Sequence, residues 1–201
     1  MEQCYPSRNI TSEDIDKVRL WHEQGERCIY TGEPIKDIKQ LLNNDLFEIE
    51  HTIPRSISFD DSLANKTICS YHYNRYTKKN LFPSQLPEAD YAAIMERIEP
   101  WKEKIKSLKK AIITSGNKAK SAATKVAKDK YISERHVHEM ELKYWEDKVS
   151  RFTATVDEWK QSFRNNQLND TRIITKYAYH FLKTIFGDVT VQKGSDRKSV
   201  V

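Results

Sequence analysis

The stretch Phe47-Glu48-Ile49-Glu50-His51-Thr52-Ile53-Pro54-Arg55-Ser56 combines a strand-like run with a carboxylate and a histidine at its end. Residues 46–51 alternate in polarity, which is typical of a half-buried strand. The residues that follow contain a turn-rich segment (54–65), a run that can pair back as a second strand (66–70) and a run that can form a short helix (71–79). The sequence therefore predicts the order strand, loop, strand, helix.

Within this unit, an acidic residue, a histidine and two asparagines follow one another in an order that suits a one-metal nuclease site. A histidine with an unperturbed pKa of about 6.5 is mostly neutral near pH 7, so His51 can act as a general base. Glu50 and the amide oxygen of Asn74 are hard ligands of the kind that Mg²⁺ prefers. Asn65 is expected to tie the loop to the strand by side-chain hydrogen bonds and so to keep His51 oriented.

Each of these residues also has a simpler interpretation. Taken singly, His51 is a hydrogen-bonded core histidine, Glu50 a surface carboxylate, and Asn65 and Asn74 turn or helix-end residues. Since Glu50 and His51 point in opposite directions along an ideal strand, they can serve one site only if the strand ends or twists there, and Pro54 favours such an ending. The ordered set within one unit favours the nuclease interpretation.

The flanking sequence is mainly helical in pattern. Thr11 and Ser12, followed by acidic residues, predict a helix over 12–24 that ends at Gly25 and turns Ile15, Val18 and Trp21 inward. Residues 27–35 combine a β-type run with a Gly and a Pro that indicate a turn. A final helix is expected near residues 168–186, with its apolar side chains buried and Gly187 as its stop, before a strand that begins with Val189 and Val191.

Between these flanks, the pattern predicts an antiparallel helical hairpin. Pro87 opens one helix, Pro100 interrupts it, and Gly116 is expected to make the turn. The apolar residues that share one face at helical spacing are Trp101, Ile105, Leu108 and Ile112 on the outward run and Tyr131, His138, Leu142, Trp145, Val149 and Phe152 on the return. Lysines dominate residues 101–130; we interpret them as a solvated face, with contact to a phosphate backbone as the alternative.

The composition argues against a membrane protein, a secreted protein and a disulfide-rich protein. The 201 residues suit one or two small domains, and no apolar run is long enough for a membrane span or a signal peptide, so we expect a cytoplasmic bacterial protein without membrane contact. Three scattered cysteines, Cys4, Cys28 and Cys69, favour free thiols rather than a disulfide framework. The formal net charge of +5 permits a polyanionic partner.

Four segments together resemble a known family. Cys28-Ile29-Tyr30-Thr31-Gly32, Ile49–Ser56, Phe59–Lys66 and Tyr73-Asn74-Arg75 look like the HNH nuclease domain of the type II CRISPR effector endonuclease. The resemblance, which is best over 28–83, implies an α+β, mostly helical fold in which a ββα-metal core carries an appended helical hairpin. It implies that His51 is the base, that Glu50 and Asn74 hold the metal, and that Asn65 is the family's middle asparagine.

The resemblance also implies cofactors, partners and a division of the chain. We expect Mg²⁺, with Mn²⁺ as a substitute, a DNA target strand paired to guide RNA, and the rest of the effector chain as partners. The expected parts are a linker helix (1–25), the nuclease core (26–86), the hairpin that completes the domain (87–152), a linker (153–168), the start of the third RuvC segment (169–194) and a tail (195–201). Position 50 is Glu where the family commonly has Asp.

Two other functions remain open at this point. One is a stand-alone HNH endonuclease of restriction or homing type, which would need its own DNA-recognition module. The other is a non-catalytic nucleic-acid-binding or helical scaffold fragment. Some HNH nucleases carry two Cys-x-x-Cys pairs for structural zinc, but Cys28 and Cys69 have no such partners, so we expect no structural zinc even with His72 nearby.

Overall fold

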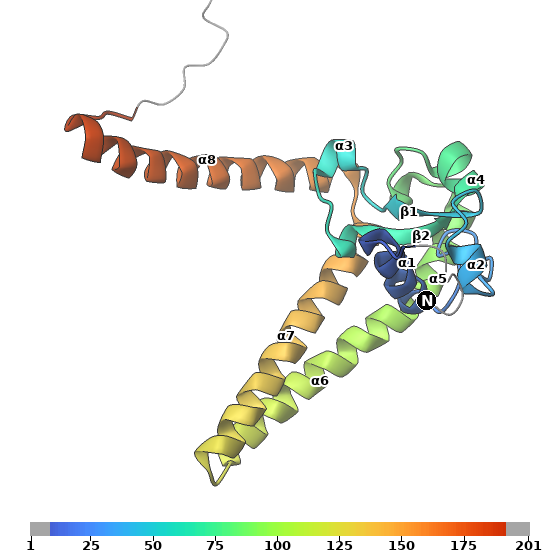
Figure 1. Cartoon of the computed structure of the whole chain (residues 1–201), viewed down its shortest axis with the longest axis horizontal. Coiled ribbons are helices and arrows are strands. Elements are labelled where there is room, and N and C mark those ends of the chain that lie inside the picture. Colours follow the sequence, from blue (N-terminus) through green and yellow to red (C-terminus); the bar gives the residue numbers. More distant parts are fainter. Residues whose placement is uncertain (1–8, 192–201) are drawn as a thin grey trace, which may run out of the picture. The chain divides into compact units, whose positions relative to one another are not determined.

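The computed structural model describes residues 9–191, and for residues 160–172 it describes the backbone alone. Two compact units follow one another and separate between Thr155 and Val156. The helices and strands, most of them labelled in Figure 1, are α1 Ser12–Glu23, α2 Ile38–Leu41, β1 Phe47–His51, α3 Arg55–Ser58, η1 Leu63–Asn65, β2 Lys66–Ser70, α4 Tyr71–Tyr73, η2 Asn74–Lys78, η3 Pro83–Gln85, α5 Glu88–Arg97, α6 Glu99–Ser121, α7 Lys125–Thr153 and α8 Val156–Phe186. The chain is thus mostly helical with a small sheet, as the sequence predicts.

The sheet of the first unit consists of β1 and β2, paired antiparallel. Its register sets Phe47 opposite Ser70 and His51 opposite Lys66. The predicted order of strand, loop, strand and helix is therefore confirmed. The helix after β2 differs from the prediction, because α4 is a single short turn that passes into the π-helical turn η2. This turn ends before Lys79, which has a positive φ of 48°.

The hydrophobic core of the first unit joins the sheet to the hairpin. Fourteen buried residues form it: Leu20, Cys28, Ile29, Tyr30, Ile35, Leu41, Phe47, Ile68, Cys69, Leu86, Ile94, Ile98, Trp101 and Phe152. Phe152 packs edge-on against Trp101, with ring centroids 5.6 Å apart, and lies 6.0 Å from the ring of Tyr30. Aromatic side chains bury large areas, so these contacts make the base of the hairpin part of the same core as the sheet.

Helix α1 begins with a capping box. The Thr11 hydroxyl accepts a hydrogen bond from the Asp14 amide, and the Asp14 carboxylate accepts one from the Thr11 amide. The helix ends before Gly25, as expected, and Gly25 has a positive φ of 63°. The predicted inward face is wrong at Ile15, which is 56% exposed, because the buried face runs through Leu20 instead.

Residues 27–35 form a turn rather than a strand, with Cys28, Ile29, Tyr30 and Ile35 buried. One isolated bridge joins Arg27 to Pro34, and Gly32 adopts a positive φ of 75°. The side chain of Arg97 from α5 packs against this glycine and donates hydrogen bonds to the carbonyls of Ile29 and Tyr30. The turn therefore takes its stability from packing against α5 instead of from a sheet.

Helices α6 and α7 lie side by side and run in opposite directions (Figure 1). The predicted turn at Gly116 is wrong: α6 continues to Ser121, and the chain reverses over residues 122–124. Lysines of α6 pair with acidic residues of α7, as in Lys104–Glu141 and Lys109–Glu146. The stretch that is basic in sequence thus meets negative charges in space, which favours the interpretation of a solvated face.

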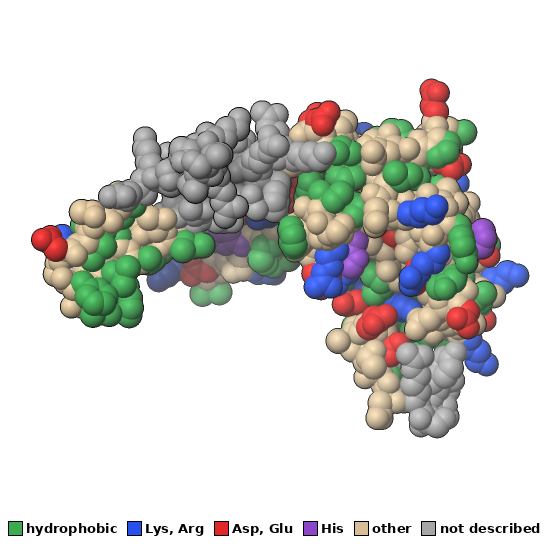
Figure 2. Space-filling model, turned by 90° about the horizontal axis from the view of Figure 1, so that it is seen from above, with side chains coloured by type: hydrophobic (Ala, Val, Ile, Leu, Met, Phe, Trp, Pro, Cys, Tyr) green, Lys and Arg blue, Asp and Glu red, His purple; other side chains and the backbone are tan. Residues whose placement is uncertain are grey.

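The described residues of the second unit form helix α8 and the short segment 187–191. Its helix α8 begins at Val156, so most of the range interpreted as a linker is helical. Gly187 follows the helix with a positive φ of 68°, as expected. The expected burial is wrong, because Ile174, Tyr177, Phe181 and Ile185 are exposed, and apolar side chains gather toward the C-terminal end of α8 (Figure 2). Residues 188–191 form no strand, and the tail from residue 195 lies outside the described residues.

Candidate active site

His51 lies at the end of β1 and faces an open cavity. Its Nε2 is 2.8 Å from Oδ1 of Asp61, and the same carboxylate oxygen is 3.1 Å from the ammonium of Lys66. The hydrogen bond with His51, followed by that with Lys66, lowers the pKa of the Asp61 carboxyl. The His51 side chain is 24% exposed. The cavity has a volume of about 440 Å³ and is lined by Ser12, Glu13, Asp16, Ile49, His51, Asp61 and Lys66.

Asn65 is fully buried and bonds the loop to the end of the strand. Its Oδ1 accepts a hydrogen bond from the Ile53 amide at 2.9 Å. Its Nδ2 donates to the carbonyls of Ile53 and Asp60 at 2.9 and 3.0 Å. These bonds confirm the predicted tie between loop and strand, two residues beyond His51.

Glu50 points away from this cavity into the protein interior, where its side chain is 1% exposed. The hydroxyls of Tyr30 and Thr67 each donate to Oε2 at 2.8 Å. The ammonium of Lys78 forms an ion pair with Oε1 and also donates to the carbonyl of His51 at 2.9 Å. Burial, followed by the charge of Glu50, raises the pKa of the Tyr30 hydroxyl, which therefore stays protonated and able to donate.

Asn74 contacts a different carboxylate from the one expected. Its Nδ2 donates to Oε1 of Glu48 at 2.6 Å. Arg75 forms a forked ion pair with the same carboxylate, from Nη2 to Oε2 at 2.8 Å and from Nε to Oε1 at 3.0 Å. The Glu48 side chain is 15% exposed and that of Arg75 is 58% exposed. This arrangement places a carboxylate and an amide together in a half-buried position.

The predicted site residues thus fall into two groups. Strand β1 turns His51 toward Asp61, whereas it turns Glu48 and Glu50 toward the other side, as strand geometry requires. The strand does end at His51, but its end does not bring Glu50 and His51 into one cavity. Lys78 links the two groups, since it contacts Glu50 and the main chain of His51.

The fit of a divalent cation differs between the two carboxylates. Mg²⁺ binds through one or two protein oxygens together with waters and phosphate oxygens. Glu48 and Asn74 are half-buried, and both oxygens of Glu48 are paired with Arg75, so an ion here would have to replace that guanidinium. Glu50 does not fit, because both of its oxygens already have buried partners, one of them a cation. Within residues 9–191, no group of three or more His, Cys, Asp or Glu side chains is placed to hold a metal.

Sequence reasoning missed Glu48, Asp61 and Lys78. Alternation along the strand puts Glu48 on the same side as Glu50, so this position could have been included. Asp61 lies in the turn-rich loop, and Lys78 comes from a π-helical turn that no pattern predicts. The contacts of Asp61 and Lys78 depend on the path of the chain between the strands and after them.

Cys28 and Cys69 are buried free thiols, as expected. The Sγ of Cys28 accepts hydrogen bonds from the amides of Thr31 and Ser70 at 3.4 and 3.3 Å. A hydrogen bond with the Cys69 thiol, together with these amides, lowers the pKa of Cys28 to about 6, whereas burial raises that of Cys69. His72 is exposed and stacks on Tyr76, with ring centroids 4.7 Å apart, so it does not join the two thiols.

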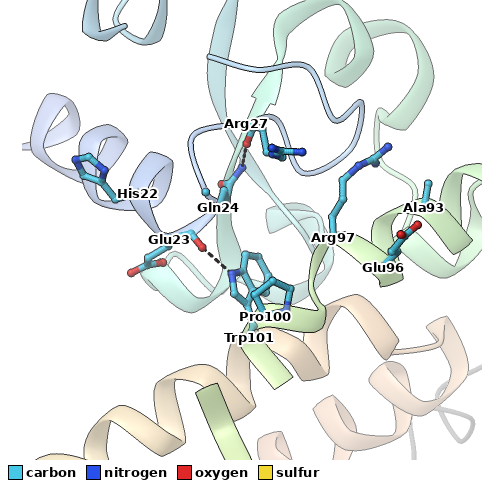
Figure 3. A pocket seen from close by; sticks show the side chains of 10 residues that line it. His22, Glu23, Gln24, Arg27, Ala93, Glu96, Arg97, Pro100 and Trp101 are labelled. Carbon is cyan, nitrogen blue, oxygen red and sulfur yellow. Dashed lines mark hydrogen bonds between the residues drawn. The ribbon is translucent and has the colours of Figure 1, made fainter. Parts of the chain in front are cut away.

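A larger cavity of about 680 Å³ lies between the end of α1 and the junction of α5 with α6 (Figure 3). Several of its polar groups are bonded within the protein. Gln24 donates to the carbonyl of Arg27 at 3.0 Å, and the Trp101 indole donates to the carbonyl of Glu23 at 2.7 Å. It contains none of His51, Asn65 and Asn74, so it is not the candidate active site.

Known proteins resemble the part of the chain that carries these residues. Residues 28–84 match the family model described as HNH endonuclease. The CRISPR-associated endonuclease Cas9 1 of Streptococcus thermophilus is 60% identical over 53 residues, which are 26% of this chain and 5% of that protein. The CRISPR-associated endonuclease Cas9 of Staphylococcus aureus is 30% identical over 172 residues, which are 85% of this chain and 14% of that protein.

A solved structure gives a weaker likeness. A crystal structure of Streptococcus thermophilus Cas9 in complex with the AGAA PAM aligns with 49% of this chain and 11% of that chain, at 31% identity and a TM-score of 0.41. By the shares of 5% and 14% given above for the two Cas9 relatives, this chain spans only a small part of their length. The family model and the Cas9 relatives indicate the same kind of protein, and we conclude that residues 28–84 form an HNH endonuclease domain of the kind found in Cas9.

Proposed function

We propose that this chain is the nuclease part of a type II CRISPR effector and hydrolyses a phosphodiester of the guide-paired DNA target strand with the help of a divalent ion. The observation that carries this proposal is the position of His51. It lies at the end of the first strand of an HNH domain, partly exposed and facing a cavity, with its Nε2 bonded to Asp61. A base must reach its substrate, and His51 meets that requirement.

His51 would take a proton from the attacking water. Because Asp61 is 2.8 Å from Nε2, it can fix the orientation of the imidazole ring and leave Nδ1 for the water. Asn65 holds the Ile53 amide and carbonyl just beyond the strand, so that the end of β1 stays in place. A general base typically contributes about 10²–10⁴-fold to a rate.

Asn74, with a neighbouring carboxylate, would bind Mg²⁺ or Mn²⁺. Such an ion neutralises charge on the phosphate and on the leaving oxygen. The half-buried position of Asn74, next to the carboxylate of Glu48, supports this assignment. The short share of each relative that the chain covers supports a second inference: the guide RNA and the remaining domains, the RuvC segments among them, belong to a longer effector.

The test is cleavage of a labelled DNA strand paired to RNA, with and without Mg²⁺. We expect slow, weakly selective nicking by the chain, because substrate positioning by the other domains is absent, and we expect EDTA to stop it. His51→Ala should lower the rate by about 10²–10⁴-fold. His136→Ala is the matched control, since His136 is an exposed histidine on α7.

Three outcomes would contradict the proposal. A rate for His51→Ala within tenfold of the parent would remove His51 as the base. A parent chain without Mg²⁺-dependent nicking would favour the non-catalytic nucleic-acid-binding fragment. Site-specific cleavage of both strands without guide RNA would favour the stand-alone restriction or homing endonuclease.

A further inference from the structure

We propose that Cys28 and Cys69 form a site of reversible oxidation, at which a peroxide converts the two thiols into a disulfide within the chain. The inference does not depend on the nuclease function, because neither thiol belongs to the groups around His51 and Asn74. Cys28 lies in the turn of residues 27–35 and Cys69 lies in β2, so the disulfide would join two segments that are far apart in the sequence.

The two thiols are hydrogen-bonded to each other in the core. The Sγ of Cys28 also accepts a hydrogen bond from the Ser70 amide at 3.3 Å. Because Ser70 follows Cys69 directly, this bond holds the Cys28 sulfur beside the end of β2. Two thiols in hydrogen-bond contact can form a disulfide once their side chains rotate.

The main chain next to each cysteine is held in place by Gln24, which is buried at the end of α1. Its Nε2 donates to the carbonyl of Arg27, just before Cys28, at 3.0 Å. The same nitrogen donates to the carbonyl of Ile68, just before Cys69, at 3.0 Å, and its Oε1 accepts from the Ile68 amide at 2.6 Å. The fold therefore keeps the two thiols together.

The surroundings give the two thiols different roles. The hydrogen bond with the Cys69 thiol, together with those from the Thr31 and Ser70 amides, lowers the pKa of Cys28. Burial raises the pKa of Cys69. Since the thiolate is the reactive form of a cysteine, Cys28 is the thiol that attacks the oxidant, and Cys69 is the thiol that closes the disulfide.

The oxidant must be small, because both side chains are 0% exposed and it can enter only when the turn opens locally. Hydrogen peroxide meets this requirement. The Cys28 thiolate attacks one peroxide oxygen and the O–O bond breaks, which leaves a sulfenic acid on Cys28. The hydroxide that leaves becomes water with the proton that the Cys28 thiol released.

In the second step, the Cys69 sulfur attacks the sulfur of the sulfenic acid. The S–S bond forms, the S–O bond breaks, and the hydroxide that leaves takes the proton of the Cys69 thiol and becomes water. Two thiols are thus oxidised to one disulfide, and one peroxide is reduced to two waters. A dithiol such as dithiothreitol reverses the change by thiol–disulfide exchange.

The experiment uses the whole chain with Cys4→Ala, which removes the one cysteine outside the pair. The folded protein is treated with hydrogen peroxide, alkylated without reductant and examined by mass spectrometry and on a non-reducing gel. We expect most chains to lose both free thiols and to stay monomeric, and dithiothreitol should restore both thiols. Two free thiols that persist after peroxide, or disulfides only between chains, would overturn the proposal.

Two further variants in the same background test the separate roles, with circular dichroism to show that each is folded. In Cys69→Ala, Cys28 should stay a sulfenic acid that dimedone labels, whereas in Cys28→Ala, Cys69 should take up no dimedone. Serine replaces alanine in a variant that does not fold. Equal labelling of the two variants, or labelling of Cys69 alone, would refute Cys28 as the attacking thiol.

Discussion

Arg151 near the end of α7 holds the carboxylate of Asp60, with its Nη2 2.7 Å and its Nε 3.1 Å from Oδ2. Asp60 lies in the loop between the two strands, and its Oδ1 accepts a hydrogen bond from the Ser62 amide. Its carbonyl accepts one from Asn65. The pair therefore fastens the loop of the candidate site to the hairpin.

The Asp60–Arg151 pair should make stability depend on pH. Burial raises the pKa of the Asp60 carboxyl, but the hydrogen bonds from Arg151 and Ser62 outweigh it, and the pKa is lowered on balance. A carboxyl whose pKa is lower in the folded state stabilises the fold above its unfolded pKa, which is about 3.9, and this contribution is lost as pH falls through the folded value. Urea unfolding of the parent from pH 6 to pH 3 should show this loss.

In Arg151→Gln, the free energy of unfolding should fall less steeply between pH 5 and 3, because the pKa of Asp60 in the folded variant is closer to its unfolded value. Arg135→Gln is the control, since Arg135 forms a more exposed pair within the same helix. Equal slopes for the parent and Arg151→Gln would show that this ion pair does not contribute to the acid sensitivity.

Asn65→Ala should destabilise the first unit and slow nicking. The substitution leaves the buried amide and carbonyl of Ile53 without their partner, and each unsatisfied buried group costs about 1–3 kcal/mol. Denaturant unfolding measures the free-energy change. Asn80→Ala is the control, because Asn80 is exposed. Equal unfolding midpoints for the two variants would mean that Asn65 does not hold the loop.

Gly32→Ala tests the close approach of Arg97. A left-handed backbone costs a residue with a Cβ about 1–2 kcal/mol, and a Cβ at position 32 would also lie 2.8 Å from Nε of Arg97. Gly25→Ala isolates the first effect, since Gly25 has a similar φ of +63° and no heavy atom within 4 Å of its added Cβ. We expect a larger loss of unfolding free energy for Gly32→Ala, and an equal loss would mean that Arg97 moves aside freely.

We predict that the chain holds no structural zinc. Cys28 and Cys69 lie together in the core, but His72 is at the surface against Tyr76, and structural zinc needs four ligands. Elemental analysis of protein purified without added metal checks this prediction. One equivalent of zinc that survives dialysis against EDTA would contradict it.

The sequence predicts the elements of the sheet well, because alternation and turn formers are local signals. It predicts strands over 46–51 and 66–70, and the structure has them at 47–51 and 66–70. The Asn65 tie follows from the preference of asparagine for main-chain partners. Of the apolar stripe predicted on the hairpin, Trp101, Leu108 and Phe152 are buried, and the rings of Trp101 and Phe152 lie edge to face.

What the sequence could not predict depends on contacts between distant residues. The burial of Glu50 requires Lys78 from another element, and the pairing of lysines on α6 with α7 depends on the two helices lying together. Gly116 is a further example. Glycine is unfavourable inside a helix, but α6 continues past Gly116 because it packs along α7. The Glu48–Asn74 contact likewise joins residues far apart in the sequence, so no local pattern predicts it.

The aromatic base of the hairpin limits where this nuclease can be shortened. A chain trimmed to the family-matching residues 28–84 would lose Leu20, Trp101 and Phe152 and leave Tyr30 and Cys28 uncovered. The carbonyl of Lys66 would also lose the hydrogen bond that it accepts from the buried ammonium of Lys148. The far tip at residues 122–124 lies outside that core, so length can be added or removed there (Figure 1). A shortened form of this chain must therefore keep the start of α6 and the end of α7, which pack against the sheet. Only the length of the two helices toward their tip can vary.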